Sequence, residues 1–159
     1  MEEEYHAYGY PFPPIKTRLD QLDEALAIIK RLWTEPRASF QGKYYSVEDA
    51  PNNPKPTQTP HPPILIGGAG EKRMLRIVAE HADIWNCPNN VSKDLERKLA
   101  VLKRHCDAVQ RDFNDIEISE QSMIVLGKDE ADYKNKLSFA QAAVGNVFDL
   151  DVALKGTPE

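Results

Sequence analysis

The sequence predicts an α/β fold built on a parallel sheet, and three observations lead to this prediction. Short apolar runs alternate with amphipathic helical segments over residues 64–143. Glycines, prolines or polar residues separate these segments, as in the glycine turn of residues 67–70. Strands that alternate with helices along a chain pair in parallel through right-handed crossovers. The length of 159 residues suits one ordinary domain.

Residues 1–33 are predicted to form a loop followed by a helix. The loop is expected over the first fourteen residues, because Gly9 and several prolines interrupt any regular element. Thr17 with Asp20 resembles a capping box at the start of the helix, and Pro36 is expected to end the helical pattern. Apolar side chains recur at steps of three and four on one helical face: Leu19, Leu22, Leu26, Ile29 and Trp33.

Residues 34–63 are predicted to be a long insertion loop that carries a short hairpin. Phe40 and Tyr44 lie on either side of Gly42, which is expected at the hairpin turn. The proline-rich stretch of residues 50–63 excludes a helix or an inner strand. One interpretation of this stretch is an interdomain linker. An ordered surface loop is favoured, because short ordered elements flank the stretch closely.

Residues 64–159 are predicted to form successive strand–helix units. Ile64–Ile66 is fully apolar, as expected for a strand that is buried on both faces. Ser92 is expected to cap a later helix, on which Cys106 faces the core. The expected order is a strand at 64–66, a glycine turn at 67–70, a helix at 71–81, a strand at 83–87, a helix after residue 92, a strand region at 116–126 and a polar helix to about residue 143.

The two ends of the chain lead to the expectation that it is a fragment. Thr157, Pro158 and Glu159 have the pattern of a helix start, where the chain stops. Three buried parallel strands leave unpaired backbone groups at both edges, and a (β/α)8 barrel needs roughly 250 residues. The alternative is a small open α/β sandwich that is complete as it stands.

Composition excludes several classes of function. The net charge is −5 and no basic stripe is present, so nucleic acid is not an expected partner. The longest apolar runs are far shorter than a membrane span, and the amino terminus is acidic where a signal peptide is basic. Two cysteines, Cys87 and Cys106, form no disulfide framework. We therefore expect a cytoplasmic protein without a membrane partner.

The candidate functional site is the glycine turn that follows the first predicted parallel strand. Such a turn leaves backbone N–H groups free at a helix start, where the helix dipole favours an anion such as phosphate. Lys72 or Arg73 is placed to add a charge-assisted contact. The turn is neither a P-loop nor a complete dinucleotide fingerprint, and a plain tight turn is the alternative. The candidate phosphate-binding residues are Gly67, Gly68, Ala69, Gly70 and Glu71.

Other candidate residues carry weaker signals. Trp85 and Asn86 end a predicted parallel strand, at the edge of the sheet where sites lie in barrels. They are candidates for the wall of a pocket, with core packing as the alternative for Trp85. The four histidines show no metal-ligand spacing, so no metal site is expected: His6, His61, His81 and His105.

Four segments in order resemble the luciferase-like monooxygenase family, most closely its branch that uses the deazaflavin coenzyme F-420. They are EEEYHAYGYPFPP, RLDQLDEALAIIKRLW, APNNPKPTQTPHPPILIGGAGEKRMLRIVAEHADIWN and GTPE. The resemblance implies a partial TIM (β/α)8 barrel of the bacterial luciferase-like type. Residues 64–66, 83–87 and the region from Ile116 would be its fifth, sixth and seventh strands. Residues 1–159 would then be a single incomplete domain.

The resemblance also implies an activity. A member of this branch transfers hydride between coenzyme F-420 and a small organic substrate, and an FMN-dependent monooxygenase is the alternative. The residues from Gly67 to Glu71 would receive the cofactor phosphate. No catalytic residue is assigned, because the family's amino-terminal half carries the usual ones. A homodimer or a chain with the missing barrel half is an expected partner. A non-catalytic truncated or pseudogene product, or one subunit of a split barrel, is the competing hypothesis.

Overall fold

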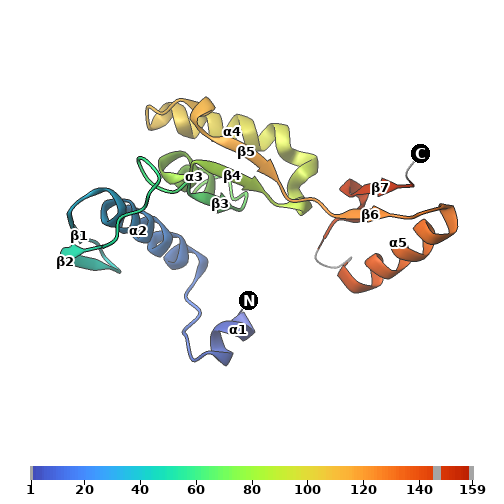
Figure 1. Cartoon of the computed structure of the whole chain (residues 1–159), viewed down its shortest axis with the longest axis horizontal. Coiled ribbons are helices and arrows are strands. Elements are labelled where there is room, and N and C mark those ends of the chain that lie inside the picture. Colours follow the sequence, from blue (N-terminus) through green and yellow to red (C-terminus); the bar gives the residue numbers. More distant parts are fainter. Residues whose placement is uncertain (1, 145–147, 158–159) are drawn as a thin grey trace. The chain divides into compact units, whose positions relative to one another are not determined.

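The computed structural model describes residues 2–144 and 148–157. The chain divides into two compact units, Met1–Pro62 and Pro63–Glu159. The first unit contains two helices and a hairpin, and the second contains the parallel strands with their helices (Figure 1). Among the described residues, no helix combines the length and the apolar character needed to cross a membrane.

The first unit begins with helix α1 (Glu2–Ala7), where the sequence predicts a loop. That prediction is wrong for these residues. Glutamates fill the first turn of α1, and carboxylates there interact favourably with the positive end of the helix dipole. Helix α1 buries none of its residues, so its sequence has no apolar pattern from which a helix could be predicted.

Helix α2 (Ile15–Thr34) confirms the long predicted helix and buries Leu26 most deeply on the predicted face. The predicted capping role of Thr17 is wrong, because α2 already begins at Ile15. Pro14 occupies the position before the helix, and no side chain caps it. At the other end Glu35 is extended, as expected for a residue that precedes a proline.

The predicted hairpin is formed by the antiparallel strands β1 (Arg37–Gln41) and β2 (Ser46–Pro51). Its turn is fastened to α2 by the carboxylate of Glu24, which accepts from the backbone amides of Lys43, Tyr44 and Tyr45 at 2.8, 2.8 and 2.9 Å. Desolvation acts to raise the pKa of Glu24, but these amides hold it below its ordinary value. A side chain at Gly42 would overlap this carboxylate, so the turn requires glycine there.

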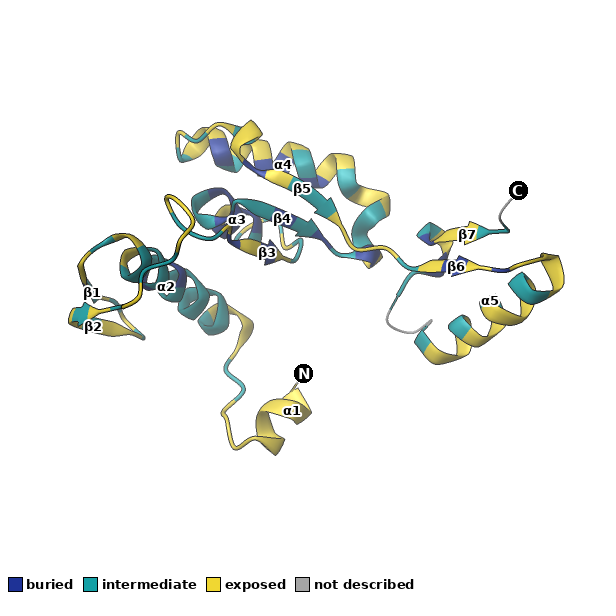
Figure 2. Ribbon diagram, viewed as in Figure 1, coloured by how far each residue is buried: buried dark blue, intermediate teal, exposed yellow. Residues whose placement is uncertain are grey.

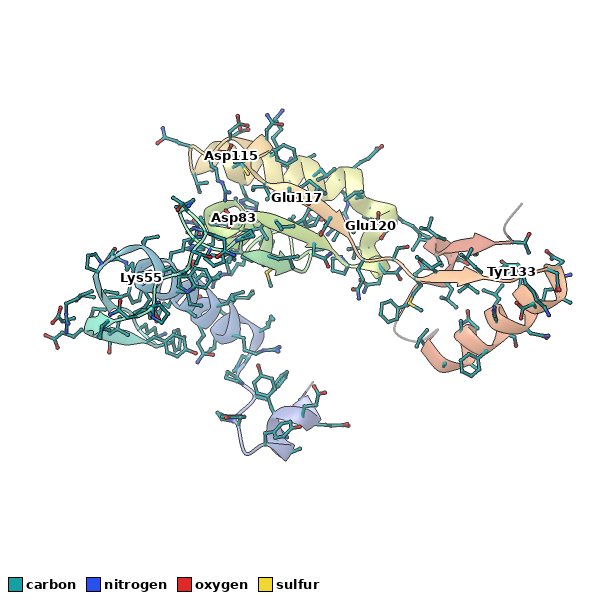
Figure 3. All side chains as sticks on the ribbon, in the orientation of Figure 1. Lys55, Asp83, Asp115, Glu117, Glu120 and Tyr133 are labelled. Carbon is teal, nitrogen blue, oxygen red and sulfur yellow. The ribbon has the colours of Figure 1, made fainter. Side chains whose placement is uncertain are left out.

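The proline-rich connection after β2 packs against the end of α2 within the first unit. Lys55, labelled in Figure 3, donates from Nζ to the carbonyl oxygens of Leu32 and Glu35, at 2.7 and 2.5 Å. The rings of Trp33 and His61 lie 5.8 Å apart between centroids. These contacts are those of an ordered surface loop, and the boundary between the two units falls at its end.

The second unit is organised around a three-stranded parallel sheet, as predicted. Its strands are β3 (Leu65–Gly67), β4 (Ile84–Cys87) and β5 (Glu117–Glu120), in that order across the sheet. Ile66 pairs with Trp85, and Trp85 with Ile118. Ile66 and Trp85 are buried, at 6% and 0% exposure, but Leu65 is 56% exposed. The prediction that the first strand is buried on both faces is therefore wrong: in this structure β3 is buried on one face.

The strand region predicted over residues 116–126 is two strands that belong to different sheets. After β5, strand β6 (Ile124–Leu126) pairs in parallel with β7 (Leu154–Gly156). Strand β5 includes Ser119 and Glu120, and residues 121–123 between β5 and β6 belong to neither a helix nor a strand. Strand β7 is absent from the sequence prediction, because so short a segment carries no readable periodicity.

Helices α3 (Met74–His81) and α4 (Leu95–Ala108) pack against one another beside the sheet. Figure 2 shows buried positions gathered on α3, on β4 and along one side of α4. Cys106 is buried, as predicted from its place on the apolar face of α4. The largest fully buried side chains of the described residues all lie in this unit: Trp85, Leu75, Leu102, Val78, Cys87 and Cys106.

Both helices begin later than the sequence predicts. Residues 71–73 form turns before α3, although the helix is predicted from Glu71. A 3-10 helix, η1 (Asn89–Asp94), precedes α4, so the capping role predicted for Ser92 is wrong. The Ser92 Oγ atom is buried and has no hydrogen-bond partner among the described residues. Pro88 starts the η1 turn before Ser92 is reached, which places Ser92 inside a helical segment.

The rest of the second unit consists of α5 (Glu130–Val144) and two short 3-10 helices, η2 (Phe113–Asp115) and η3 (Leu150–Val152). Helix α5 confirms the predicted polar helix. A side chain at Gly127 would overlap the backbone of Tyr133, which is labelled in Figure 3, so the approach of β6 to α5 requires glycine. The helix start predicted at the carboxyl terminus involves Pro158 and Glu159, which lie outside the described residues.

Candidate functional site

The glycine turn lies at the carboxyl edge of the three-stranded sheet. Gly67 ends β3 and pairs with Asn86 of β4, which pairs in turn with Ser119 of β5. Gly68 has a φ of +114°, a conformation that residues with a side chain rarely adopt. In open α/β sheets, ligands bind outside the carboxyl ends of the strands, so this row of residues is the candidate site.

A run of unpaired backbone amides follows Gly68. The N–H groups of residues 69–72 have no hydrogen-bond partner among the described residues, whereas the Gly70 carbonyl accepts from the Leu75 amide at 3.0 Å. Because α3 begins only at Met74, these N–H groups precede the helix instead of forming its first turn. Successive free N–H groups beside a helix amino terminus are suited to binding an anion.

The side chain of Trp85 is hydrogen-bonded to the glycine turn. Trp85 is fully buried, and its indole Nε1 donates to the Gly68 carbonyl oxygen at 2.8 Å. The core interpretation of Trp85 is therefore confirmed. Asn86 is half-buried and donates from Nδ2 to the Ser119 hydroxyl at 2.9 Å, which orders the strand ends next to the turn.

Glu71 is held by cations of α4. Its carboxylate accepts from Lys98 Nζ at 2.8 Å and from Arg97 Nη1 at 2.5 Å. Its carbonyl oxygen lies 2.7 Å from His105 Nε2. Lys98 is only 8% exposed, so the charge of Glu71 compensates a nearly buried ammonium group. This geometry favours a role for Glu71 in fixing the turn, because a carboxylate that faced a phosphate would repel it.

The Glu71–Lys98 pair predicts an acid-sensitive turn. The hydrogen bond from Lys98 lowers the pKa of Glu71 below its ordinary value of 4.5. A carboxyl group with a lowered folded-state pKa contributes stability above its unfolded pKa, and this is lost as the pH falls through the folded-state pKa. We expect the NMR amide signals of Gly68 and Gly70 to titrate with a midpoint below 4.5.

The control for this titration is Glu71→Gln, which removes the titrating group and keeps the shape of the side chain. The two glycine signals of this variant should show no transition in the same acid range. A midpoint at or above 4.5 in the unaltered chain would contradict the pairing, as would the same transition in the variant.

The other candidate residues from the sequence do not form one cluster around the glycine turn. Lys72 is exposed beside it, and Arg73 occupies the position before α3. Cys87 and Cys106 are both buried, and burial raises the pKa of each thiol, which disfavours the reactive thiolate. His105 contacts the turn through the Glu71 carbonyl oxygen.

Lys98 and Ser119 contact the candidate site but are not among the residues that the sequence predicts for it. A signal for Lys98 exists, because it falls between Leu95 and Leu102 on the apolar face of α4. A lysine in that position needs a buried acceptor or carboxylate. Ser119 has no such signal, since its place beside Asn86 depends on the register between β4 and β5.

Comparison with known proteins agrees with this architecture. The family model described as luciferase-like monooxygenase matches residues 1–153. The F-420-dependent glucose-6-phosphate dehydrogenase of Kineococcus radiotolerans is 29% identical over 127 residues, which is 79% of this chain and 37% of that protein. The FMNH(2)-dependent dimethylsulfone monooxygenase of Pseudomonas putida is 34% identical over 89 residues, which is 56% of this chain and 24% of that protein.

Solved structures share the α/β fold. A structure of an F-420-dependent secondary alcohol dehydrogenase superposes with a TM-score of 0.73 at 17% identity, over 92% of this chain and 42% of that chain. The coenzyme F-420 dependent tetrahydromethanopterin reductase of Methanopyrus kandleri gives a TM-score of 0.70 at 18% identity, over 96% of this chain and 50% of that one.

The matches to the two curated relatives thus span less than two fifths of each relative's length, but the family model covers nearly all of this chain. The predicted family is confirmed: the chain belongs to the luciferase-like monooxygenase family.

Proposed function

We propose that this chain supplies the cofactor-phosphate site of an oxidoreductase that transfers hydride between coenzyme F-420 and a small organic substrate. The observation that carries the proposal is the run of unpaired amides over residues 69–72 at the carboxyl edge of the sheet. In this proposal β3, β4 and β5 are the fifth, sixth and seventh strands of a (β/α)8 barrel, and residues 1–159 belong to one luciferase-like domain.

The residues of the turn fit a phosphate group. A Cβ at Gly67 would make only an ordinary contact, 4.0 Å from the Asn86 carbonyl oxygen, and Gly68 adopts a backbone conformation that favours glycine. Phosphate oxygens would accept from the amides of Ala69 and Gly70, while Glu71 holds the turn through α4. When bound, the deazaflavin ring accepts or donates the hydride, and the protein binds, orients and shields it. No residue of the chain is assigned to the chemical step.

An FMN-dependent monooxygenase is the second candidate function. The similarity to the dimethylsulfone monooxygenase of Pseudomonas putida favours it, and FMN also carries a phosphate that the same turn would bind. A non-catalytic role is the third hypothesis. In it, the chain binds a phosphate ligand, or it needs a second chain to complete the barrel. A homodimer is the alternative assembly, and size-exclusion chromatography distinguishes a dimer from a monomer.

Cofactor titration tests the proposal. We expect the purified chain to bind coenzyme F-420 saturably in a fluorescence titration, and more tightly than FMN. Riboflavin, which is FMN without the phosphate, is the matched control for the role of the turn. It should bind at least roughly tenfold more weakly than FMN, because charge-assisted hydrogen bonds to the phosphate are lost.

Each outcome of the titration separates the hypotheses. Tighter binding of FMN than of coenzyme F-420 would favour the monooxygenase. Equal binding of FMN and riboflavin would contradict a phosphate site at the turn. A chain that is folded by circular dichroism but binds none of the three would favour a role that needs a second chain.

A further inference from the structure

Helix α4 contacts the backbone of the glycine turn as well as a side chain beside it. Lys98 and Arg97 bind the carboxylate of Glu71, whereas His105 Nε2 lies 2.7 Å from the Glu71 carbonyl oxygen. A carbonyl oxygen can only accept a hydrogen bond, so the Nε2 atom must carry the hydrogen and donate it. His105 therefore fixes the orientation of the peptide group that joins Glu71 to Lys72.

The orientation of this peptide group determines where the Lys72 amide points. The peptide bond is trans, and in a trans peptide the C=O and the following N–H lie in one plane and point in opposite directions. Because the Glu71 carbonyl is directed towards His105 on α4, the Lys72 N–H is directed away from α4. It is one of the amides of residues 69–72 that have no partner among the described residues.

Two other carbonyl oxygens of the turn are held in the same way. The Gly68 carbonyl accepts from Trp85 Nε1 at 2.8 Å, and the Gly70 carbonyl accepts from the Leu75 amide at 3.0 Å. By the same geometry, each bond orients the N–H group of the residue that follows the glycine. Donors that are already oriented bind an anion more tightly, because less freedom is lost on binding.

We propose that His105 is a positioning residue for the cofactor phosphate, and that the Lys72 amide binds this phosphate together with the amides of Ala69 and Gly70. This role rests on the proposed function, since it requires an anion at the turn. His105 acts through the peptide group and does not itself touch the ligand. Its side chain is half-buried at a position on α4, so it can be replaced without emptying the core around Trp85.

Parallel fluorescence titrations with FMN and riboflavin test this role, because the ratio of the two affinities isolates the contribution of the phosphate. His105→Met removes the donor and should lower the ratio by about threefold or more, with riboflavin binding unchanged. His105→Gln should restore most of the ratio, because the glutamine side chain keeps an N–H donor. Lys103→Met is the matched control, since it alters an exposed position of the same helix and should leave the ratio unchanged.

The order of the Lys72 amide gives a second readout that needs no ligand. Nitrogen-15 relaxation should give an order parameter of about 0.85, the value of rigid backbone, in the unaltered chain and in His105→Gln. In His105→Met it should fall towards the value of about 0.6 below which backbone is flexible. An unchanged order parameter in His105→Met would contradict the positioning role.

The titrations distinguish a failure of this role from a failure of the proposed function. Equal binding of FMN and riboflavin by the unaltered chain would overturn both. A preference for FMN that persists in His105→Met, or that falls equally in Lys103→Met, would overturn the role of His105 alone. Circular dichroism establishes that each variant is folded. If His105→Met does not fold, the imidazole nitrogen-15 signals of the unaltered chain decide, because a neutral ring with its hydrogen on Nδ1 would contradict the bond to Glu71.

Discussion

Gly68→Asp is expected to weaken binding of coenzyme F-420 by at least roughly a hundredfold, because like charges in close contact cost several kcal/mol. The new carboxylate would stand next to the unpaired amides of residues 69–72, where the phosphate is proposed to bind. The φ of +114° at Gly68 also disfavours any side chain, so the turn itself would change shape. The measurement is the dissociation constant from a fluorescence titration of each purified variant.

Two further substitutions separate charge from backbone strain. Gly68→Ala introduces the strain without the charge and is expected to bind more tightly than Gly68→Asp. Gly70 has no left-handed backbone conformation, and a Cβ there would lie at an ordinary 3.5 Å from the Met74 side chain. Gly70→Asp should therefore weaken binding while Gly70→Ala largely preserves it. Unchanged affinity in both aspartate variants would show that the phosphate binds elsewhere.

Trp85→Ala is expected to destabilise the second unit by about 3–5 kcal/mol, the usual cost of removing a large buried aromatic side chain. Trp85 is fully buried in the middle strand of the parallel sheet, where it pairs with Ile66 and Ile118. The substitution leaves a cavity in the core and the Gly68 carbonyl without its indole donor. Urea unfolding followed by circular dichroism measures the loss.

The controls for Trp85→Ala separate packing from hydrogen bonding. Trp85→Phe retains most of the apolar contact but loses the hydrogen bond to Gly68, so we expect a smaller loss that includes about 1 kcal/mol for that bond. Trp33→Ala changes the half-buried tryptophan of the first unit and should cost less than Trp85→Ala. Equal losses in Trp33→Ala and Trp85→Ala would contradict the central place of Trp85.

The sequence predicts the elements whose signal is local. Leu65–Gly67 and Ile84–Cys87 are readable as strands because their apolar runs are bounded by turn residues. The glycine turn is readable because a strand ends in glycines directly before a helical pattern. The family follows from the order of these segments, and the match over residues 1–153 confirms it.

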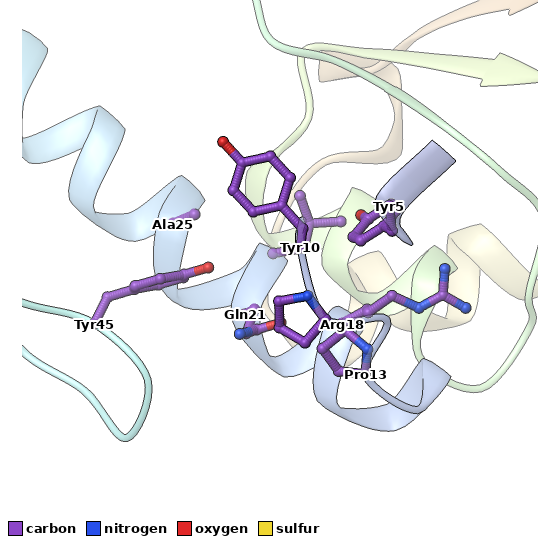
Figure 4. A pocket seen from close by; sticks show the side chains of 9 residues that line it. Tyr5, Tyr10, Pro13, Arg18, Gln21, Ala25 and Tyr45 are labelled. Atoms are coloured by element: carbon purple, nitrogen blue, oxygen red, sulfur yellow. The ribbon is translucent and has the colours of Figure 1, made fainter. Parts of the chain in front are cut away.

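Features that depend on distant contacts escape prediction from sequence. The separation of β5 from β6 is decided by the pairing of β6 with β7, which lies about thirty residues further along the chain. Helix α3 begins later than predicted. Glu71, which precedes it, is bound by Lys98 and Arg97, which lie 27 and 26 positions further along the chain. An open depression in the first unit is lined by Tyr5, Tyr10 and Tyr45, which come from three segments whose separate patterns carry no common signal (Figure 4).

The division of the chain has an optical consequence, because each unit holds one of the two tryptophans. Trp85 is fully buried and hydrogen-bonded to the Gly68 carbonyl oxygen, so its fluorescence emission should be shifted to shorter wavelengths. Trp33 is half-exposed beside His61, so its fluorescence emission should lie at longer wavelengths. Variants that retain a single tryptophan would therefore report the unfolding of each unit as a separate spectroscopic signal.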